Sequence, residues 1–507
     1  MKVVFVLYDS LNRRSLEPYG AATIRTPNFR RLAERAVTFD SHYVGSLPCM
    51  PARRDMQTGR LSFLHRSWGP LEPFDNSFPE LLHVAGIYSH LVSDHYHYWE
   101  DGGATYHNRY TTYEFIRGQE RDPWKAMVEP PWERLREMYH PLQFNEERRS
   151  LHYHHVVNRE FIREEADFPS VRCFDGGLDF LERNRHARDW LLQIETFDPH
   201  EPFHAPAAYR AEYPTNYAGP ILDWPPYKRV TEAPDECAEL RANYCAIVAL
   251  CDAQLGRLLD CFDAYGLWSD TALLLTTDHG FLLGEHDWWG KCRMPCFNEV
   301  SHIPLFFHHP DYASRAGERR RSLTQTTDVM ATLLDLFGVE APPEVEGRSL
   351  VRVLERDEPI REAALYGVWG SATNITDGRY TYFRYPDDVR RQEIYQYTLM
   401  ATHLKELFGV EELRTASLAK PFAFTKGVPV LKVRGTEKSP MFDTNLGPGR
   451  LAGTETALFD LETDPDQLTP IRDADVEARL IRQMVTLMRE NDAPAEAYTR
   501  LDLAVPA

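Results

Sequence analysis

The segment KVVFVLYDS, residues 2–10, decides the fold class of this chain. Its nearly unbroken run of apolar side chains up to Tyr8 is typical of a strand that is buried on both faces of a parallel sheet. Asp9 follows directly, at the carboxyl end of this strand. The segment therefore predicts a central strand of a parallel sheet with an acidic group at its end.

The same order of strand and polar end is repeated along the chain. Further strands are predicted at 88–94, 189–197 and 271–277, and the last two lead into Asp198-Pro199-His200 and Asp278-His279-Gly280. Helices are predicted at 28–36, 77–86, 237–266 and within 324–350. This alternation is typical of an α/β protein, in which sites form outside the carboxyl ends of the strands.

A length of 507 residues predicts one large domain and a smaller one. We expect residues 1–365 to form the large domain, with a mostly parallel central sheet that is flanked by helices. Later in the chain strands dominate, at 379–385 and 457–465, and a last helix is predicted near 475–491. Residues 366–507 are therefore predicted to form a smaller C-terminal α+β subdomain.

Composition and charge exclude several classes of protein. The formal net charge of −19 argues against nucleic-acid binding, which normally requires a basic face. An anionic substrate must then be attracted by local positive charge. No apolar stretch approaches eighteen residues, and the run after Met1 is too short for a signal peptide, so we expect no membrane partner. A cytoplasmic protein with reduced cysteines is predicted.

The clearest motif is Cys49-Met50-Pro51-Ala52-Arg53, followed by Thr58-Gly59-Arg60. It resembles the C-x-P-x-R signature and trailing T-G-R of the sulfatase family, the formylglycine-dependent members of the alkaline phosphatase superfamily. The resemblance spans most of the chain and includes the segments 26–44, 77–86, 327–339 and 457–467. It implies an alkaline-phosphatase-like fold and arylsulfatase-like hydrolysis of sulfate esters.

The resemblance implies a specific nucleophile. Maturation enzymes of the family oxidise the signature cysteine, here Cys49, to formylglycine, and the hydrated aldehyde carries two hydroxyls on one carbon. One hydroxyl attacks sulfur and forms a covalent sulfo-enzyme intermediate. The second hydroxyl then loses its proton, and the adduct collapses, releases sulfate and restores the aldehyde. Arg53 belongs to the signature and orients the formylglycine in the family.

A metal site is implied by the same resemblance. Asp9 resembles the first metal ligand of the family, Asp278 and His279 resemble its later pair, and Cys49 completes the site. Carboxylates with one imidazole suit one divalent ion, Ca²⁺ or Mn²⁺, with Mg²⁺ as a further candidate. Many sulfatases carry two consecutive acids at the first position, whereas Ser10 follows Asp9 here. Ser10 or Asn12 could supply a neutral oxygen, and the sequence leaves that choice open.

Cationic and proton-donating groups are needed for the substrate oxygens and the leaving group. Lys291, in GEHDWWGK, matches the second active-site lysine of the family, and His200, in TFDPHEPF, matches its D-P-H-x-P histidine. The usual G-K-W-H segment is replaced by Ser93-Asp94-His95-Tyr96-His97. Because alternate residues of an extended strand share a face, His95 and His97 are candidates for the places of that lysine and histidine. The alternative is that this histidine cluster shapes a pocket wall.

Residues 100–175 do not follow the family pattern and are predicted to be an insertion that sets specificity at the mouth of the site. The implied partners are a small anionic ester substrate and a formylglycine-generating maturation enzyme, and a homo-oligomer is left open.

Two other functions remain open from the sequence. The first is a phosphonate monoester or phosphodiester hydrolase with the same nucleophile, which the less acidic Asp9-Ser10 pair favours. The second is a catalytically dead binding protein that keeps the sulfatase fold. This last function predicts neither a metal nor a modified cysteine.

Overall fold

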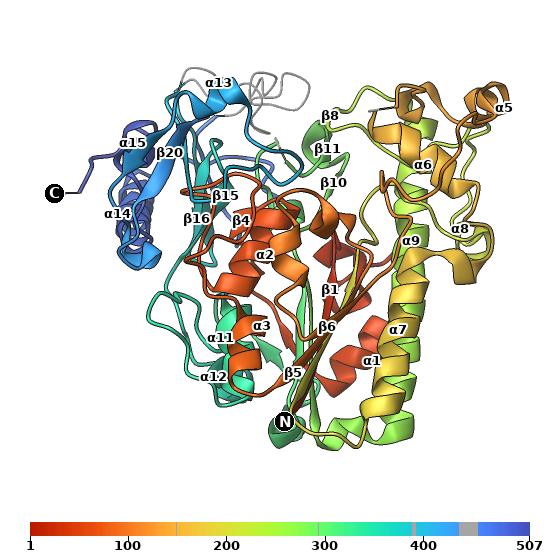
Figure 1. Ribbon diagram of the computed structural model, residues 1–507, viewed down its shortest axis with the longest axis horizontal. Coiled ribbons are helices and arrows are strands. Elements are labelled where there is room, and N and C mark those ends of the chain that lie inside the picture. Colours follow the sequence, from red (N-terminus) through yellow and green to blue (C-terminus); the bar gives the residue numbers. More distant parts are fainter. Residues whose placement is uncertain (149, 293, 388–391, 436–454, 507) are drawn as a thin grey trace.

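The computed structural model describes the chain except for residues 149, 293, 388–391, 436–454 and 507. Some of these residues fall inside the predicted insertion 100–175 and the predicted subdomain 366–507. Among the described residues, a central sheet of eight strands is flanked by helices, and a second sheet of five strands lies beside it (Figure 1).

The central sheet is mostly parallel, with the strand order β13-β2-β12-β9-β1-β7-β5-β6. Parallel pairing joins the neighbours β9 (Thr271–Thr277), β1 (Lys2–Tyr8), β7 (Trp190–Thr196), β5 (Tyr88–Ser93) and β6 (Thr112–Phe115). On the other side, β12 (Leu305–His308) runs antiparallel to β9 and to β2 (Val37–Phe39), and β13 (Arg319–Arg320) runs parallel to β2. The predicted α/β class with a mostly parallel central sheet is confirmed.

Alternating side chains of β1 fill two separate hydrophobic cores. Val4, Val6 and Tyr8 pack in the core that contains α1 (Pro27–Arg35), α7 (Pro169–Asn184) and α9 (Pro234–Tyr265). Val3, Phe5 and Leu7 pack in the core of the other face, with α2 (Cys49–Thr58), α3 (Phe78–Val84), α11 (Asp328–Leu336) and α12 (Val351–Arg356). Figure 1 shows these two groups of helices on opposite sides of the sheet. Since both faces are covered, the end of β1 is held firmly in place.

The second sheet has the order β21-β17-β16-β15-β4. Four strands come from the C-terminal part: β15 (Ala364–Val368), β16 (Thr373–Thr376), β17 (Tyr380–Arg384) and β21 (Ala457–Asp460). The fifth, β4 (Ser46–Leu47), lies just before Cys49 and pairs in parallel with β15. A shared core also joins Leu61 and Phe63 to Leu480 and Met484 of α14 (Ala474–Glu490).

The second sheet begins next to the predicted boundary at residue 365, yet it includes a strand from the beginning of the chain. The division into residues 1–365 and 366–507 stays a prediction. The predicted strands at 2–8, 189–197 and 271–277 are confirmed, as are the helices at 28–36, 77–86 and 237–266. None of the helices in the described part of the chain combines the length and apolar character needed to span a membrane.

Candidate active site

Acidic residues that follow two neighbouring strands meet at the carboxyl edge of the central sheet. Tyr8 of β1 lies opposite Thr277 of β9, so the next residue of each strand, Asp9 and Asp278, reaches the same edge. The backbone N–H of Ser10 donates a hydrogen bond to Oδ1 of Asp278 at 3.1 Å. Both carboxylates are fully buried. The structure thus brings together two of the residues that the sequence indicated as metal ligands.

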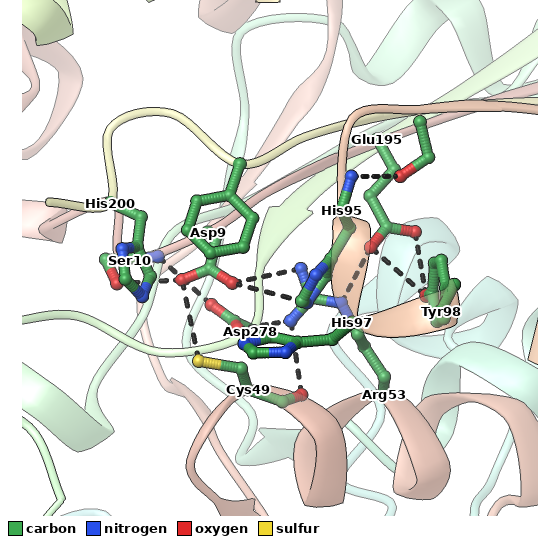
Figure 2. A network of polar contacts seen from close by, with 12 residues as sticks. Asp9, Ser10, Cys49, Arg53, His95, His97, Tyr98, Glu195, His200 and Asp278 are labelled. Atoms are coloured by element: carbon green, nitrogen blue, oxygen red, sulfur yellow. Dashed lines mark hydrogen bonds and ion pairs between the residues drawn. The ribbon is translucent and has the colours of Figure 1, made fainter. Parts of the chain in front are cut away.

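Cys49 is the first residue of α2 and points at these two carboxylates. Its Sγ lies 3.3 Å from Nε2 of His279. It also lies 3.9 Å from Oδ1 of Asp9, a contact drawn in Figure 2. Further along α2, the buried Asp55 accepts hydrogen bonds from the backbone N–H groups of Ser46 and Ser62, at 2.6 and 2.9 Å. The start of α2 is therefore tied to β4 and to the loop after the helix, which fixes the position of Cys49.

The donor set at this point suits a divalent cation. One ligand atom from each of Asp9, Cys49, Asp278 and His279 lies within 4.8 Å of the others. His279 Nδ1 lies 2.9 Å from the carbonyl oxygen of Gly280, which can only accept, so Nδ1 carries the proton. Its Nε2 therefore presents a lone pair to the cluster, as in metal-binding histidines. Oδ2 of Asp9 is buried and has no hydrogen-bond partner among the described residues, although Nη2 of Arg53 lies 3.1 Å from it. These residues fit the implied metal ion.

Arg53 lies one turn after Cys49 and joins three buried carboxylates. Its guanidinium contacts Glu195 and Asp278 at 2.6 Å each, and Asp9 at 3.1 Å. Its Nη1 also donates to the carbonyl oxygen of Cys49 at 3.1 Å. Arg53 is 1% exposed, so these ion pairs are shielded from water. Arg53 therefore orients the beginning of α2 relative to both strand ends.

The sequence did not single out Glu195, which lies near the carboxyl end of β7. It also accepts hydrogen bonds from the hydroxyl of Tyr98 at 3.1 Å and from the side-chain amide of Gln193 at 2.9 Å. The signal that could have identified Glu195 from the sequence was its charge inside the apolar segment 189–197. In a strand that is buried on both faces, such a residue needs a charged partner, here Arg53.

Lys291 and His200 stand at the edge of the same cluster. Lys291 Nζ donates to Ser10 Oγ at 2.7 Å and lies 3.4 Å from Asp9 Oδ1. Nδ1 of His200 donates to the carbonyl oxygen of Glu201 at 2.5 Å. Glu201 also lies 3.8 Å from Lys291 and accepts from the hydroxyl of Tyr227. The sequence indicated Lys291 and His200, but it did not indicate Glu201.

The charges of the cluster control the protonation of its members. Burial alone would raise the pKa of Asp9, but Lys291 and Arg53 outweigh it and hold this pKa well below its ordinary range. Burial, followed by the charge of Asp9, raises the pKa of the Cys49 thiol. Burial also lowers the pKa of His279 to about 3. At neutral pH, Asp9 is thus anionic, the Cys49 thiol keeps its proton and His279 is neutral.

The two candidates for the missing G-K-W-H segment do not lie on an extended strand. That part of the prediction is wrong, because β5 ends at Ser93 and a 3-10 helix, Tyr96–Trp99, follows. The turn places the ring centroids of His95 and His97 5.2 Å apart. His95 Nε2 lies 3.8 Å from Asp9 Oδ2, and neither ring nitrogen of His95 has a hydrogen-bond partner in the described part of the chain.

His97 is held differently from His95. Its Nδ1 contacts Glu100 at 2.6 Å, and its ring packs edge-on against Trp68 at 5.2 Å. His97 lines the cavity beside Cys49. His95 thus reaches the acidic cluster, while His97 forms part of the pocket wall, as the alternative for this segment expected.

The two neutral candidates that follow Asp9 have different contacts. Ser10 has a positive φ of 63°, and its Oγ donates to Asp9 Oδ1 at 2.8 Å. The side chain of Asn12 instead binds the backbone of Phe281. Its Oδ1 accepts a hydrogen bond from the N–H of Phe281 at 2.6 Å, and its Nδ2 donates one to the carbonyl oxygen of Phe281 at 2.8 Å. Asn12 therefore holds the loop after His279, whereas Ser10 touches the cluster directly.

A cavity of about 550 Å³ has Cys49, His200 and Lys291 in its wall. Distant parts of the chain also contribute to the wall, among them Trp68, Glu120, Arg121, His152, Trp224, Tyr227, Trp369, His403 and Lys405. Cavities of this size hold drug-sized ligands. Glu120, Arg121 and His152 belong to the predicted insertion 100–175, so part of that segment borders the site.

The chain is similar to known proteins over most of its length. Residues 2–339 match the family model "Sulfatase", and residues 284–418 match the model "N-sulphoglucosamine sulphohydrolase, C-terminal". An N-acetylglucosamine-6-O-sulfatase of Bacteroides thetaiotaomicron is 23% identical over 469 residues, which cover 81% of this chain and 83% of that protein.

Solved structures show the same fold. A protein in complex with its substrate D-glucosamine-2-N,6-O-disulfate has a TM-score of 0.67 at 16% identity, and the match covers 98% of this chain and 99% of the other. A phosphonate monoester hydrolase of Agrobacterium radiobacter has a TM-score of 0.64 at 19% identity, and the match covers 97% of this chain and 95% of the other.

Proposed function

Because the chain belongs to the sulfatase family, we propose that it is a metal-dependent hydrolase of sulfate esters whose nucleophile is a formylglycine derived from Cys49. One observation carries the proposal: ligand atoms of Asp9, Asp278, His279 and Cys49 lie within 4.8 Å of one another, and Cys49 lines a cavity. A small anionic ester is the substrate class that the family and the cationic side chains of this cavity support.

The state of the thiol supports a modified residue at position 49. Burial and Asp9 raise the pKa of Cys49, so the unmodified side chain is a poor nucleophile at neutral pH. In the proposed reaction, one hydroxyl of the hydrated aldehyde attacks sulfur and the alcohol leaves. The second hydroxyl then loses its proton, the carbon–oxygen bond to the sulfate breaks and the aldehyde forms again.

Asp9, Asp278 and His279 would hold the metal ion together with the side chain of residue 49. When bound, the ion would lower the pKa of a nearby hydroxyl and stabilise the charge that develops on the transferred group. Asp9 is anionic and His279 presents a lone pair, so neither needs to lose a proton before binding. We propose Ca²⁺ or Mn²⁺, with Mg²⁺ as a further candidate.

Lys291 and His200 have separate roles in this proposal. Lys291 stays positively charged, because Cys49, Glu201 and Asp9 raise its pKa more than burial lowers it. It would contact a substrate oxygen and assist the departure of the alcohol. His200 lines the same cavity, and its Nδ1 proton is already donated to Glu201, so its Nε2 can accept a hydrogen bond.

Mass spectrometry of the peptide that contains residues 49–53 tests the nucleophile. The protein should be coproduced with a formylglycine-generating enzyme, which is the maturation partner of this proposal. Conversion of the thiol to an aldehyde lowers the peptide mass and abolishes reaction with thiol reagents. We expect Cys49→Ala to lose turnover of an aryl sulfate while it keeps the native circular dichroism spectrum. An unmodified Cys49 in fully active protein would refute the mechanism.

A phosphonate monoester or phosphodiester hydrolase is a second candidate, and the contacts of Ser10 favour it. Ser10 places a neutral hydroxyl between Asp9 and Lys291, where many sulfatases carry a second acid. The site is therefore less negative than in those sulfatases, and in this respect it resembles phosphonate monoester hydrolases more than typical sulfatases. Turnover of 4-nitrophenyl sulfate and of a 4-nitrophenyl phosphonate monoester by the same preparation separates the two activities.

A binding protein with a dead site makes the opposite prediction on each measurement. It requires neither an aldehyde at position 49 nor a response to divalent cations. The buried ion pairs of Arg53 and Lys291 with Asp9 argue against it, because unused charges are costly to keep inside a protein. A cytoplasmic location is part of the proposal and can be tested by cell fractionation.

A further inference from the structure

A turn from the C-terminal part of the chain reaches the wall of the active-site cavity. Residues 402–407 form this turn, with a β-bridge between Thr402 and Leu407. The backbone N–H of His403 donates to the carbonyl oxygen of Glu406 at 2.8 Å, which closes the turn. Lys405 lies inside it and lines the cavity that also contains Cys49.

The turn is anchored from two directions. Arg66, which is fully buried, donates to the carbonyl oxygen of Thr402 at 2.5 Å. The backbone N–H of Gly102 donates to the carbonyl oxygen of Leu404 at 2.8 Å. A Cβ atom on Gly102 would lie only 2.3 Å from the carbonyl oxygen of His403, so glycine is needed for this close approach. Lys405 is therefore presented at a defined place.

Lys405 differs from the other cations of the cavity wall in its contacts. The other cations contact acidic side chains: Lys291 contacts Asp9, Arg121 contacts Glu100, and Lys228 contacts Glu232. In the described part of the chain, Lys405 Nζ makes neither a hydrogen bond nor an ion pair. Instead it lies 5.1 Å from the ring centroid of Trp68. Lys405 is exposed to the cavity. Its ammonium group is thus steadied by an aromatic face and remains available to an anion.

We propose that Lys405 binds a second anionic group of the substrate, carried by the alcohol part of the ester. This inference rests on the proposed hydrolysis at position 49, where Lys291 already serves the reacting group. The cavity of about 550 Å³ leaves room for a ring beyond the sulfate, and Trp68, Trp224 and Tyr227 offer it aromatic faces. The substrate class is therefore an aryl or sugar sulfate with a carboxylate or a second sulfo group.

Two matched substrates test this assignment: 4-carboxyphenyl sulfate and its neutral amide, 4-carbamoylphenyl sulfate. The measured quantity is the ratio of their kcat/KM values, which cancels general losses of activity. We expect Lys405→Met to lower this ratio by about 10- to 100-fold, mainly through KM, because one charge-assisted contact is lost. Lys405→Arg should restore most of the ratio. 4-Sulfophenyl sulfate, as a third substrate, distinguishes a preference for sulfo groups from one for carboxylates.

Lys420→Met is the control, because it removes the same charge from an exposed position outside the cavity wall. It should leave the ratio unchanged. An unchanged ratio in Lys405→Met would overturn the proposal, as would an equal fall in Lys420→Met.

A binding measurement separates this inference from the proposed nucleophile. Calorimetric titration of 4-carboxyphenyl sulfate into Cys49→Ala and into Cys49→Ala/Lys405→Met needs no turnover. Weaker binding by the double variant supports the role of Lys405, even if the wild-type protein proves to lack formylglycine. Equal binding by both variants contradicts that role, even if the wild-type protein is an active sulfatase.

Discussion

Arg53 is the residue on which the geometry of the site depends most. It pairs with three carboxylates at the carboxyl ends of parallel strands, Asp9 after β1, Glu195 in β7 and Asp278 after β9, while its own helix starts at Cys49. Three acids this close would repel one another without a cation. Arg53 and the three acids are all buried, so water does not screen this repulsion. The arginine of the signature therefore links Cys49 to the sheet.

We expect Glu195→Ala to lower the free energy of unfolding by about 3–5 kcal/mol, because it leaves part of the Arg53 charge buried and unpaired. Urea denaturation measures this loss. Glu195→Gln keeps a polar partner for Tyr98 and should be less destabilising, while kcat still falls because Arg53 loses its anchor. Glu182→Ala removes an exposed carboxylate and should change the stability by less than about 0.5 kcal/mol. A destabilisation by Glu195→Ala no larger than this would contradict the assigned role.

The proposed metal ligands can be tested without an activity assay. After dialysis against a chelator, addition of Ca²⁺ or Mn²⁺ should raise the melting temperature, since a ligand at 100 times its Kd stabilises the folded state by about 2.7 kcal/mol. Asp9→Asn and His279→Ala should each abolish most of this shift. Asp101→Asn, at an exposed position, should retain it. A full shift in Asp9→Asn would place the ion elsewhere.

The segment that follows β5 brings two buried acids together behind the site. Asp94, just after β5, accepts hydrogen bonds from the backbone N–H of Phe197 at 2.6 Å and from the amide of Gln119 at 3.1 Å. The same amide donates to Asp198 at 2.9 Å, and Ser170 also donates to Asp198. Within the described residues, neither acid has an ion pair. Burial, together with Asp198, raises the pKa of Asp94, and burial raises the pKa of Asp198 to about 6.

This pair makes the stability depend on pH. A carboxyl group whose pKa is higher in the folded state than in the unfolded state favours folding at low pH. For Asp198 this stabilising contribution is complete below about pH 4 and is lost as the pH rises through about 6. The resulting decrease in the free energy of unfolding is about 3 kcal/mol. Urea denaturation at several pH values should show this decline in the wild-type protein. Asp198→Asn should flatten it, and an unchanged slope in that variant would refute the assignment.

The second sheet joins the two ends of the chain. β4 ends at Leu47, two residues before Cys49, and pairs with β15, so the segment that leads into Cys49 is an edge strand of the second sheet. The C-terminal part also supplies Trp369, His403 and Lys405 to the cavity wall. The site is therefore built by both parts of the molecule, although Asp9, Cys49, Asp278 and His279 all lie before residue 365.

A chain truncated after residue 365 should not form a stable, active protein. Truncation cuts β15 after its second residue and removes β16, β17, β21 and the helix α14, and so exposes Leu61, Phe63 and Leu365 of their shared core. We expect rapid proteolysis and binding of a hydrophobic dye. A truncated protein that resists proteolysis as the full chain does would show that residues 1–365 fold independently.

The sequence predicted much of the fold and of the cluster around Cys49. β1, β7 and β9 are buried on both faces, so their apolar runs are long and their polar ends are distinct. It failed at His95 and His97, since the period of two is valid only while the strand continues and β5 ends at Ser93. It also missed Glu195, because a single acid in an apolar strand has meaning only when its partner, Arg53, is known.

The amino-acid sequence by itself determined the family, the alternation of strands and helices, and the set of chemical groups near Cys49. These features are encoded locally, in hydrophobic periodicity and in short motifs. Only the tertiary structure decided that β4 belongs to the C-terminal sheet, that Asn12 supports a loop, and that Lys405 enters the cavity. Such contacts join residues that are hundreds of positions apart, and they depend on how whole elements pack rather than on any local pattern.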